Sequence, residues 1–197
     1  MHDVQATGGA SLTGDANSNR TGGRRRIGVL LAVAATVTVL DQVTKAMATA
    51  WLQDGRVVTV IDGIVELRLV RNPGAAFSIA TNLTVVFTAI AAVVAVVILR
   101  ASRRLTSLPW ALALGTLLGG ALGNLVDRLV REPGPLRGHV VDFVELPNWP
   151  LFNVADAAIV GAAVLIGWLS LRGVAYDAQA GPAGGAGPES AAGENDR

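Results

Sequence analysis

Four long apolar runs constrain the fold of this chain more than any other feature of its sequence. They cover residues 27–51, 83–99, 110–129 and 152–171. A helix that spans a bilayer needs about 20 mostly apolar residues. The chain is 51% hydrophobic and only 16% charged. We therefore predict an all-α membrane protein, with a four-helix domain over residues 27–172 and disordered polar arms at 1–26 and 173–197.

Arginines at the ends of the runs predict the topology. They precede the first run, follow the second and follow the fourth: Arg24, Arg25, Arg26, Arg100, Arg103, Arg104 and Arg172. By the positive-inside rule both termini are cytoplasmic, and residues 52–75 and 130–151 lie outside. The outer segments also hold five arginines, so the bias is incomplete. An alternative is a cleaved signal peptide ending near Ala46-Met47-Ala48. Three further spans and the charges within the first run argue against it.

Two short outer segments differ from the apolar runs. Residues 57–71 contain two β-branched stretches around Asp62-Gly63, a strong hairpin signal. We expect a small extracytoplasmic β-hairpin or cradle there. The second segment, residues 136–150, is bounded by prolines. We expect it to be a loop that carries Asp142 and helps to gate the site.

The composition excludes several kinds of chemistry. There is no cysteine, which removes disulfides, thiolate metal sites and a cysteine nucleophile. The two histidines, His2 and His139, are far apart, so a histidine-based triad or zinc site would rest on His139 alone. We expect no metal and no cofactor. The net charge of +1 gives no argument for nucleic-acid binding.

Ionisable side chains within the spans are costly and are functional candidates by default. Asp41 and Lys45 have the i, i+4 spacing of a helical ion pair, which also fits a purely structural anchor. In the third span Gly115, Gly119 and Gly123 form a row that allows close helix approach. A neighbouring row holds an amide and a guanidinium beside a carboxylate: Gly120, Asn124 and Arg128, with Asp127. Interfacial anchoring by Asp127 and Arg128 is the structural alternative, but it explains Asn124 poorly.

Two further carboxyl groups can perform chemistry together. Asp142 lies among valines and a phenylalanine, and Asp156 lies one turn inside the fourth span with Asn153 on its face. Two carboxyl groups brought together share a proton, so one deprotonates water while the other protonates a carbonyl oxygen or leaving amine. On spacing alone, a structural alternative is better supported: Asp142 caps a short helix and Asp156 pairs with Arg128.

Five ordered blocks resemble one known family, the bacterial lipoprotein signal peptidases, or signal peptidase II. The blocks are Asp41-Gln42-x-x-Lys45, Asn72-x-Gly74-Ala75-Ala76-Phe77-Ser78, Gly119-Gly120-Ala121-x-Gly123-Asn124-x-x-Asp127-Arg128, Val140-Val141-Asp142-Phe143 and Phe152-Asn153-x-Ala155-Asp156. Each block is weak alone, but five in order over residues 27–172 are specific.

The resemblance implies an aspartic endopeptidase of the bacterial inner membrane, with its active site at the extracytoplasmic face. The family cleaves prolipoproteins just before a diacylglyceryl-modified cysteine and is the target of globomycin. The implied catalytic dyad is Asp142 and Asp156. Substrate-site roles are implied for Asn72, Gly74, Gly120, Asn124, Arg128 and Asn153, with structural support from Asp41, Lys45 and Asp127. The implied partners are prolipoproteins and membrane lipids, and we expect a monomer.

Three other functions remain to be weighed. A transporter would use Asp41, Lys45, Asp127 and Asp156 as a relay, but it predicts ionisable groups spread through the membrane depth. A structural subunit would not need its amides and carboxylates together. A serine–lysine protease has Lys45 available, but no serine is placed near it with assurance.

Overall fold

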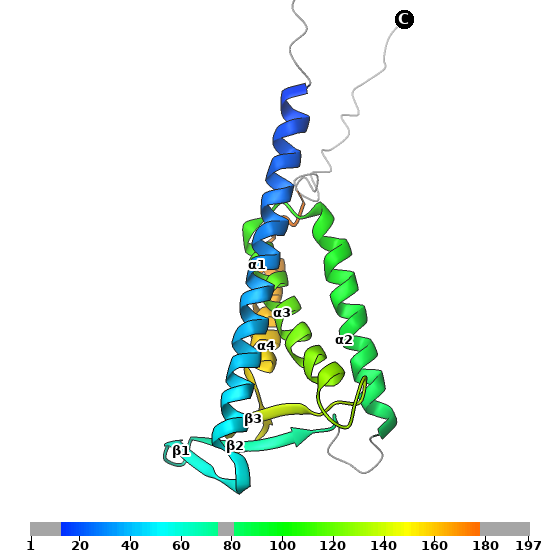
Figure 1. Cartoon of the computed structure of the whole chain (residues 1–197). Helices are drawn as coiled ribbons and strands as arrows, with labels where there is room; N and C mark the ends of the chain where they lie inside the picture. The colour runs from blue at the N-terminus through cyan, green and yellow to red at the C-terminus, as the bar shows by residue number, and fades with distance from the viewer. Residues whose placement is uncertain (1–12, 75–80, 178–197) are drawn as a thin grey trace, which may run out of the picture.

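The computed structural model describes residues 13–74 and 81–177, which form four long helices and one small sheet (Figure 1). The helices are α1 (Thr13–Trp51), α2 (Thr81–Ala101), α3 (Leu108–Val130) and α4 (Val154–Leu171). Short 3-10 turns follow α1 at Gln53–Gly55 and α2 at Ser102–Arg104. All four helices are long and apolar enough to cross a membrane, which confirms the four predicted spans.

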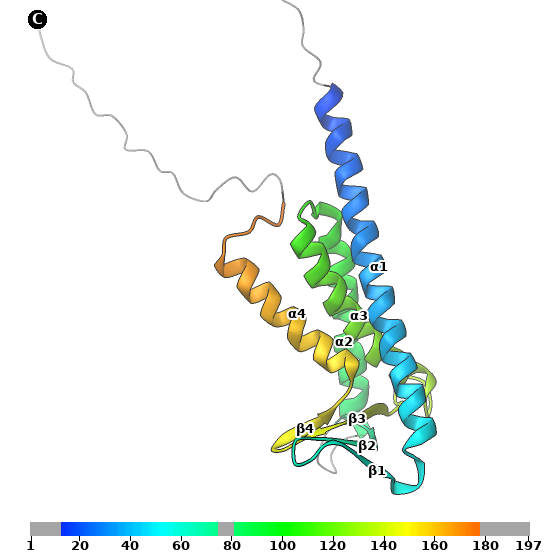
Figure 2. The ribbon, with the colours of Figure 1, turned by 90° about the vertical axis from the view of Figure 1, so that its left-hand side faces the viewer.

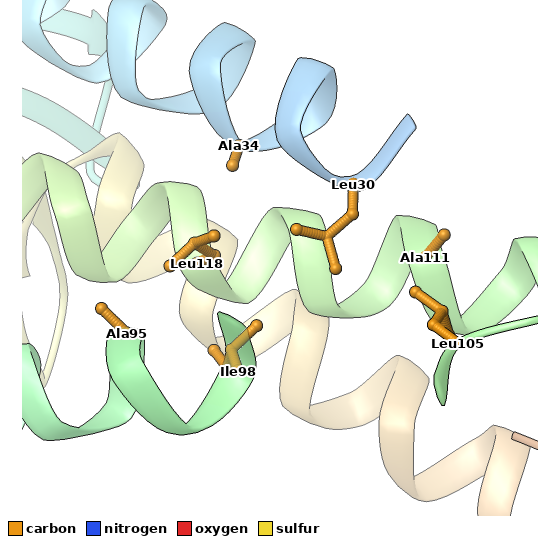
Figure 3. Packing of buried hydrophobic residues seen from close by; sticks show 7 residues of the cluster. All are labelled: Leu30, Ala34, Ala95, Ile98, Leu105, Ala111 and Leu118. Carbon is orange, nitrogen blue, oxygen red and sulfur yellow. The ribbon is translucent and has the colours of Figure 1, made fainter. Parts of the chain in front are cut away.

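The helices pack around α3, which contacts each of the other three. Near the end remote from the sheet, a cluster of buried side chains joins α1, α2 and α3 (Figure 3). Its members are Leu30, Ala34, Ala95, Ile98, Leu105, Ala111 and Leu118. Outward-facing positions are apolar as well, as with Val93, Val164 and Leu171. Apolar side chains on both the inner and outer surfaces are what a lipid environment favours.

Two regions outside the spans differ from the sequence-based expectation of disordered arms. Helix α1 begins at Thr13, inside the arm predicted at 1–26. Extending a helix that has already formed adds one hydrogen bond per residue without a new nucleation cost, so polar residues can continue it. At the other end, Trp110 donates its indole N–H to the Val174 carbonyl at 2.9 Å and packs edge-on against Tyr176. Residues 173–177 are therefore ordered by α3, and residues 178–197 lie outside the described ranges.

The sheet has four antiparallel strands in the order β1-β2-β3-β4. The strands are β1 (Val57–Ile61), β2 (Val65–Asn72), β3 (Val140–Leu146) and β4 (Trp149–Phe152). The turn between β1 and β2 holds Gly63 at φ +67, which confirms the predicted hairpin. The prediction that residues 136–150 form a loop is wrong for most of this segment, because β3 and β4 occupy it. Strand β3 completes its backbone hydrogen bonds by pairing with β2, with Val70 opposite Asp142.

The sheet lies across one end of the helix bundle, while the start of α1 and the end of α4 lie at the other (Figures 1 and 2). Helix α4 follows β4 after a single residue, and β3 lies beneath the end of α3. This arrangement brings the sheet ends of α1, α3 and α4 close to β3. Polar residues at those helix ends can therefore meet the side chains of β3.

Candidate active site

Two carboxyl groups meet where the sheet adjoins the bundle. Asp142 is on β3 with only 2% of its surface exposed, and Asp156 is in the first turn of α4. Asn153 is the N-cap of α4: its side-chain oxygen accepts from the Asp156 N–H at 3.0 Å. The Asp156 carboxylate accepts in return from the Asn153 N–H at 3.2 Å. This capping box explains why α4 begins here, and it fixes the Asp156 side chain.

Three asparagine side chains hold the two carboxyl groups. Asn72 and Asn153 each donate an amide N–H to Asp142, at 2.8 and 2.6 Å. Asn124 donates to Asp156 Oδ1 at 2.9 Å, and its own oxygen accepts from Asn153 at 3.3 Å. Each carboxyl group thus accepts two hydrogen bonds, and Asn153 contacts both. The amides orient the carboxyl groups without adding any charge of their own.

The environment of Asp142 favours its protonated form. Burial raises the pKa of this carboxyl above its ordinary value of 3.8 by disfavouring the charged state. The amide of Asn72 lowers the pKa, the nearby charge of Asp156 raises it further, and Asn153 lowers it. The net direction is upward. A protonated acid beside a second carboxyl group is the arrangement needed for acid–base chemistry on a bound water.

A buried ion cluster lies behind the asparagines. The Lys45 ammonium contacts Asp41 at 2.7 Å, Asp127 at 2.9 Å and the Asn124 oxygen at 3.0 Å. Lys45, Asp41 and Asp127 all have 0% exposed surface. Lys45 therefore uses all three of its N–H donors inside the protein. Arg131 contacts Asp127 from the outer side at 2.7 Å.

Each carboxylate of this cluster also accepts a backbone N–H beside one member of the acid pair. Asp127 accepts from Val141 N at 3.1 Å, next to Asp142. Asp41 accepts from Ala155 N at 2.9 Å, next to Asp156. The cluster thus ties β3 and the first turn of α4 to α1 and α3. This tie fixes the backbones that carry the two carboxyl groups relative to each other.

An open cavity of about 440 Å³ extends from the two carboxyl groups into the bundle. Its polar end holds Asn72, Asn124, Arg128, Asp142 and Asp156. Its walls are mostly apolar: Phe87, Ile90, Ala91, Val94, Leu117, Ala121, Val140 and Ile159. This lining suits an apolar ligand with one polar, reactive region at the level of the sheet.

A family model described as signal peptidase (SPase) II matches residues 33–172, which include every residue of this site. The chain belongs to this family. A lipoprotein signal peptidase of Mycobacterium avium is 55% identical over 153 residues, which are 78% of this chain and 84% of the relative. One of Mycobacterium tuberculosis strain H37Rv is 54% identical over 78% of this chain and 76% of its own length.

Two solved structures share the fold of this signal peptidase II family member. A bacterial membrane enzyme determined by the in meso method at 1.9 Å is 28% identical and superposes with a TM-score of 0.66. The match covers 74% of this chain and 94% of that one. A 2.3 Å structure under the same description gives a TM-score of 0.65, over 74% and 88% of the two chains. The chain is therefore a protease of the aspartic type, as its family is.

The structure brings most of the sequence-predicted residues of this signal peptidase II family member together. Asp142, Asp156, Asn72, Asn124 and Asn153 form one hydrogen-bonded group, and Asp41, Lys45 and Asp127 support it. The structural alternative had Asp142 capping a short helix and Asp156 pairing with Arg128. In the structure Asp142 lies on strand β3, and Asp156 accepts hydrogen bonds from Asn124 and Asn153. Of the second motif block, Ala75, Ala76, Phe77 and Ser78 lie outside the described residues.

Arg128 and Gly74 meet at the edge of the site. The Arg128 guanidinium donates to the carbonyls of Gly138 at 3.1 Å and Asn72 at 3.4 Å. Gly74 has a φ of +102, and a Cβ there would lie 2.8 Å from the Arg128 guanidinium. Both the backbone conformation and the close approach therefore require glycine. Gly74 N–H donates to the side-chain oxygen of Asn72 at 2.8 Å, which leaves the Asn72 amide free to face Asp142.

The sequence assigned no role to two residues that support the site. Gln42 donates to the Gly123 carbonyl at 3.0 Å and contacts the carboxylates of Asp41 and Asp127 at 3.2 Å. The sequence places Gln42 directly after Asp41, but it does not show which way the Gln42 side chain points. Gly138 lies against the end of α3, where a Cβ would be 2.2 Å from the Asp127 carbonyl. No local signal marks it, since its contact comes from the tertiary fold.

Gly120 packs against α4 and is not among the residues that line the cavity. A Cβ there would lie 2.6 Å from the Ala155 carbonyl and 2.8 Å from Ile159. We expect Gly120→Ala to lower the free energy of unfolding by about 1–3 kcal/mol, because α4 must move away. The matched control is Gly161→Ala in α4, where nothing lies within 4 Å of the added carbon. Thermal unfolding in detergent compares them, and equal melting temperatures would contradict the contact.

The raised pKa of Asp142 predicts a pH dependence of stability. The unfolded carboxyl ionises near the ordinary value of 3.8, whereas the folded one holds its proton to higher pH. Its stabilising contribution is therefore present below pH 3.8 and is lost as the pH rises through the folded pKa. Asp142→Asn should remove that loss. Melting temperatures of the two proteins are compared from pH 3.8 upward. Parallel curves would show that Asp142 has an ordinary pKa.

Proposed function

We propose that this chain removes signal peptides from prolipoproteins by cleaving before a cysteine that carries a diacylglyceryl group. Its relatives carry the name lipoprotein signal peptidase, which supports this substrate. The observation that carries the proposal is the pair of amide-held carboxyl groups, Asp142 and Asp156, at the polar end of an apolar cavity. Such a cavity suits a lipid-bearing, apolar substrate.

The two carboxyl groups divide the chemistry of peptide hydrolysis. Ionised Asp156 takes a proton from a water molecule, and the water oxygen attacks the scissile carbonyl carbon. Protonated Asp142 donates its proton to the carbonyl oxygen, which gives a neutral tetrahedral intermediate. The C–N bond then breaks as Asp156 returns a proton to the departing amine and Asp142 recovers one from the hydroxyl group. The raised pKa of Asp142 supports its assignment as the initial acid.

The remaining polar residues position the substrate and the dyad. Asn124 and Asn153 fix the two carboxyl groups, and Arg128 joins the end of β2, at Asn72, to the segment before β3, at Gly138. Gly74 supports the substrate site by letting the Arg128 guanidinium approach the backbone closely at the edge of the site. The apolar walls take the hydrophobic part of the signal peptide and the acyl chains. Binding energy from these parts then holds the scissile carbonyl between the two acids.

The membrane placement is part of the same proposal. The arginines at the ends of the spans support cytoplasmic termini, with the sheet and dyad at the extracytoplasmic face of the bacterial inner membrane. A substrate held by acyl chains in the outer leaflet presents its scissile bond at that depth. The chain acts as a monomer in this proposal. Ion translocation is disfavoured because Asp41, Lys45, Asp127 and Asp156 gather at one end of the bundle.

The experiment that tests the function is cleavage by the purified full chain in lipid-containing detergent. Two substrates are compared: a prolipoprotein with a diacylglyceryl-modified cysteine, and the same prolipoprotein unmodified. We expect cleavage of the modified form immediately before the cysteine, because the acyl chains supply the binding energy. Equal cleavage of both forms would remove the lipid requirement. No cleavage of the modified form by folded protein would overturn the proposed substrate.

A further inference from the structure

A second apolar groove lies apart from the catalytic cavity. It has a volume of about 350 Å³ and shares no lining residue with that cavity. The last turns of α1 form one wall, and strands β1, β2 and β3 form the other. Its main lining residues are Met47, Ala48, Trp51, Val58, Leu67 and Phe143. Phe143 follows Asp142 on β3, and consecutive strand residues point to opposite faces. The groove and the dyad are therefore on opposite faces of β3.

The groove crosses the membrane boundary. Its α1 wall runs from Thr44 to Trp51, where the span ends, so it extends roughly 10 Å along the helix. Trp51 is 64% exposed although it is large and apolar. Tryptophan at the end of a span is typical of the headgroup region. An opening lined by apolar side chains at this depth faces acyl chains on its membrane side and headgroups on its other side.

One positive charge stands at the headgroup end of the groove. Arg56 lines the groove just beyond the end of the span. Within residues 13–74 and 81–177, no acidic side chain forms an ion pair with it, including Asp54 two residues earlier. An arginine beside an apolar slot complements a phospholipid whose phosphate charge is not balanced by a cation in the same headgroup. It does not complement a neutral diacylglyceryl group in the same way.

We propose that this groove binds one acyl chain of an anionic phospholipid, with Arg56 on the phosphate. The volume is at the lower end of the range for ligand sites, which suits one chain and excludes a whole lipid. The proposal rests on the membrane placement given above, but it does not depend on proteolysis. The bound chain would pack against Phe143, on the face of β3 opposite the dyad.

Native mass spectrometry of the purified full chain tests the site by titration with dioleoylphosphatidylglycerol or dioleoylphosphatidylcholine. We expect one retained phosphatidylglycerol, with a Kd about fivefold lower than that of phosphatidylcholine, as one arginine at an anionic lipid surface implies. Arg56→Gln should abolish the preference. The matched control is Arg137→Gln, an exposed arginine at the same end of the protein, which should keep it.

A second variant tests the apolar part of the groove. The Thr44 hydroxyl donates to the Leu40 and Asp41 carbonyls of its own helix, so Thr44→Phe fills the groove without removing a contact between elements. We expect at least a fivefold loss of affinity for both lipids. Equal affinity of the unaltered chain for the two lipids would overturn the proposal. So would a preference retained in Arg56→Gln, a preference lost in Arg137→Gln, or binding unchanged in Thr44→Phe. Because no substrate is present, these outcomes are independent of the proposed proteolysis.

Discussion

Asp142→Asn and Asp156→Asn should each lower kcat for prolipoprotein cleavage by about 10³-fold or more, which is within the range for loss of a positioned acid or base. Asparagine has nearly the same shape as aspartate, but its amide acts neither as a general acid nor as a general base. Both carboxyl groups are held by amide donors, at 2.6 to 2.9 Å. In each variant an NH2 group replaces one carboxylate oxygen, so one of the hydrogen-bond donors loses its acceptor. The measurement is therefore made on variants shown to be folded.

The matched control for the dyad is Glu145→Gln, on the same strand as Asp142. Glu145 pairs with Arg68 at the protein surface, where an ion pair contributes at most about 1 kcal/mol. We expect its cleavage rate to stay within about twofold of the unaltered protein, since surface pairs of this kind contribute little. Near-normal turnover by either dyad variant would contradict the assignment. A comparable loss in Glu145→Gln would mean that any charge change on β3 disturbs the enzyme.

The sequence predicted the helices well, because their signal is local. Twenty consecutive apolar residues can satisfy their backbone groups in lipid only as a helix, whatever the rest of the chain does. The hairpin at Gly63 also has a local signal. Strand β3 does not, since its partner β2 is about 70 residues earlier and Asn72 pairs with Val140. Nonlocal pairing of this kind leaves little trace in a single sequence, so β3 was expected to be a loop.

The sequence indicated which residues come together, but not which contacts they make with one another. The i, i+4 spacing of Asp41 and Lys45 predicted an ion pair, which is found at 2.7 Å. The structural alternative paired Asp127 with Arg128 as an interfacial anchor, but adjacent helical residues point in different directions. Asp127 instead faces Lys45, and Arg128 faces the carbonyls of Asn72 and Gly138. The sharing of one cation by α1 and α3 depends on helix packing, which spacing within one helix cannot show.

Replacing that shared cation should have the largest effect on stability. Lys45→Met keeps the length of the side chain but leaves the carboxylates of Asp41 and Asp127 buried without their common partner. Breaking a buried ion pair by removing one member costs about 3–5 kcal/mol. The variant also frees Asn124, which Lys45 contacts at 3.0 Å, and so loosens Asp156. We expect a large fall in the melting temperature, together with loss of cleavage by the remaining folded protein.

Two comparisons decide whether uncompensated charge is the cause. Arg131→Met removes another cation from Asp127, but Arg131 is 26% exposed and Lys45 remains, so we expect a cost of about 1 kcal/mol or less. The triple variant Asp41→Asn, Lys45→Met, Asp127→Asn removes all three charges. It keeps side-chain oxygens that can accept from Ala155 N and Val141 N, so it should recover most of the stability. A triple variant as unstable as Lys45→Met would show that the contacts of the ammonium matter more than its charge. An unaltered melting temperature in Lys45→Met would mean that the ion cluster does not hold β3 and α4 in place.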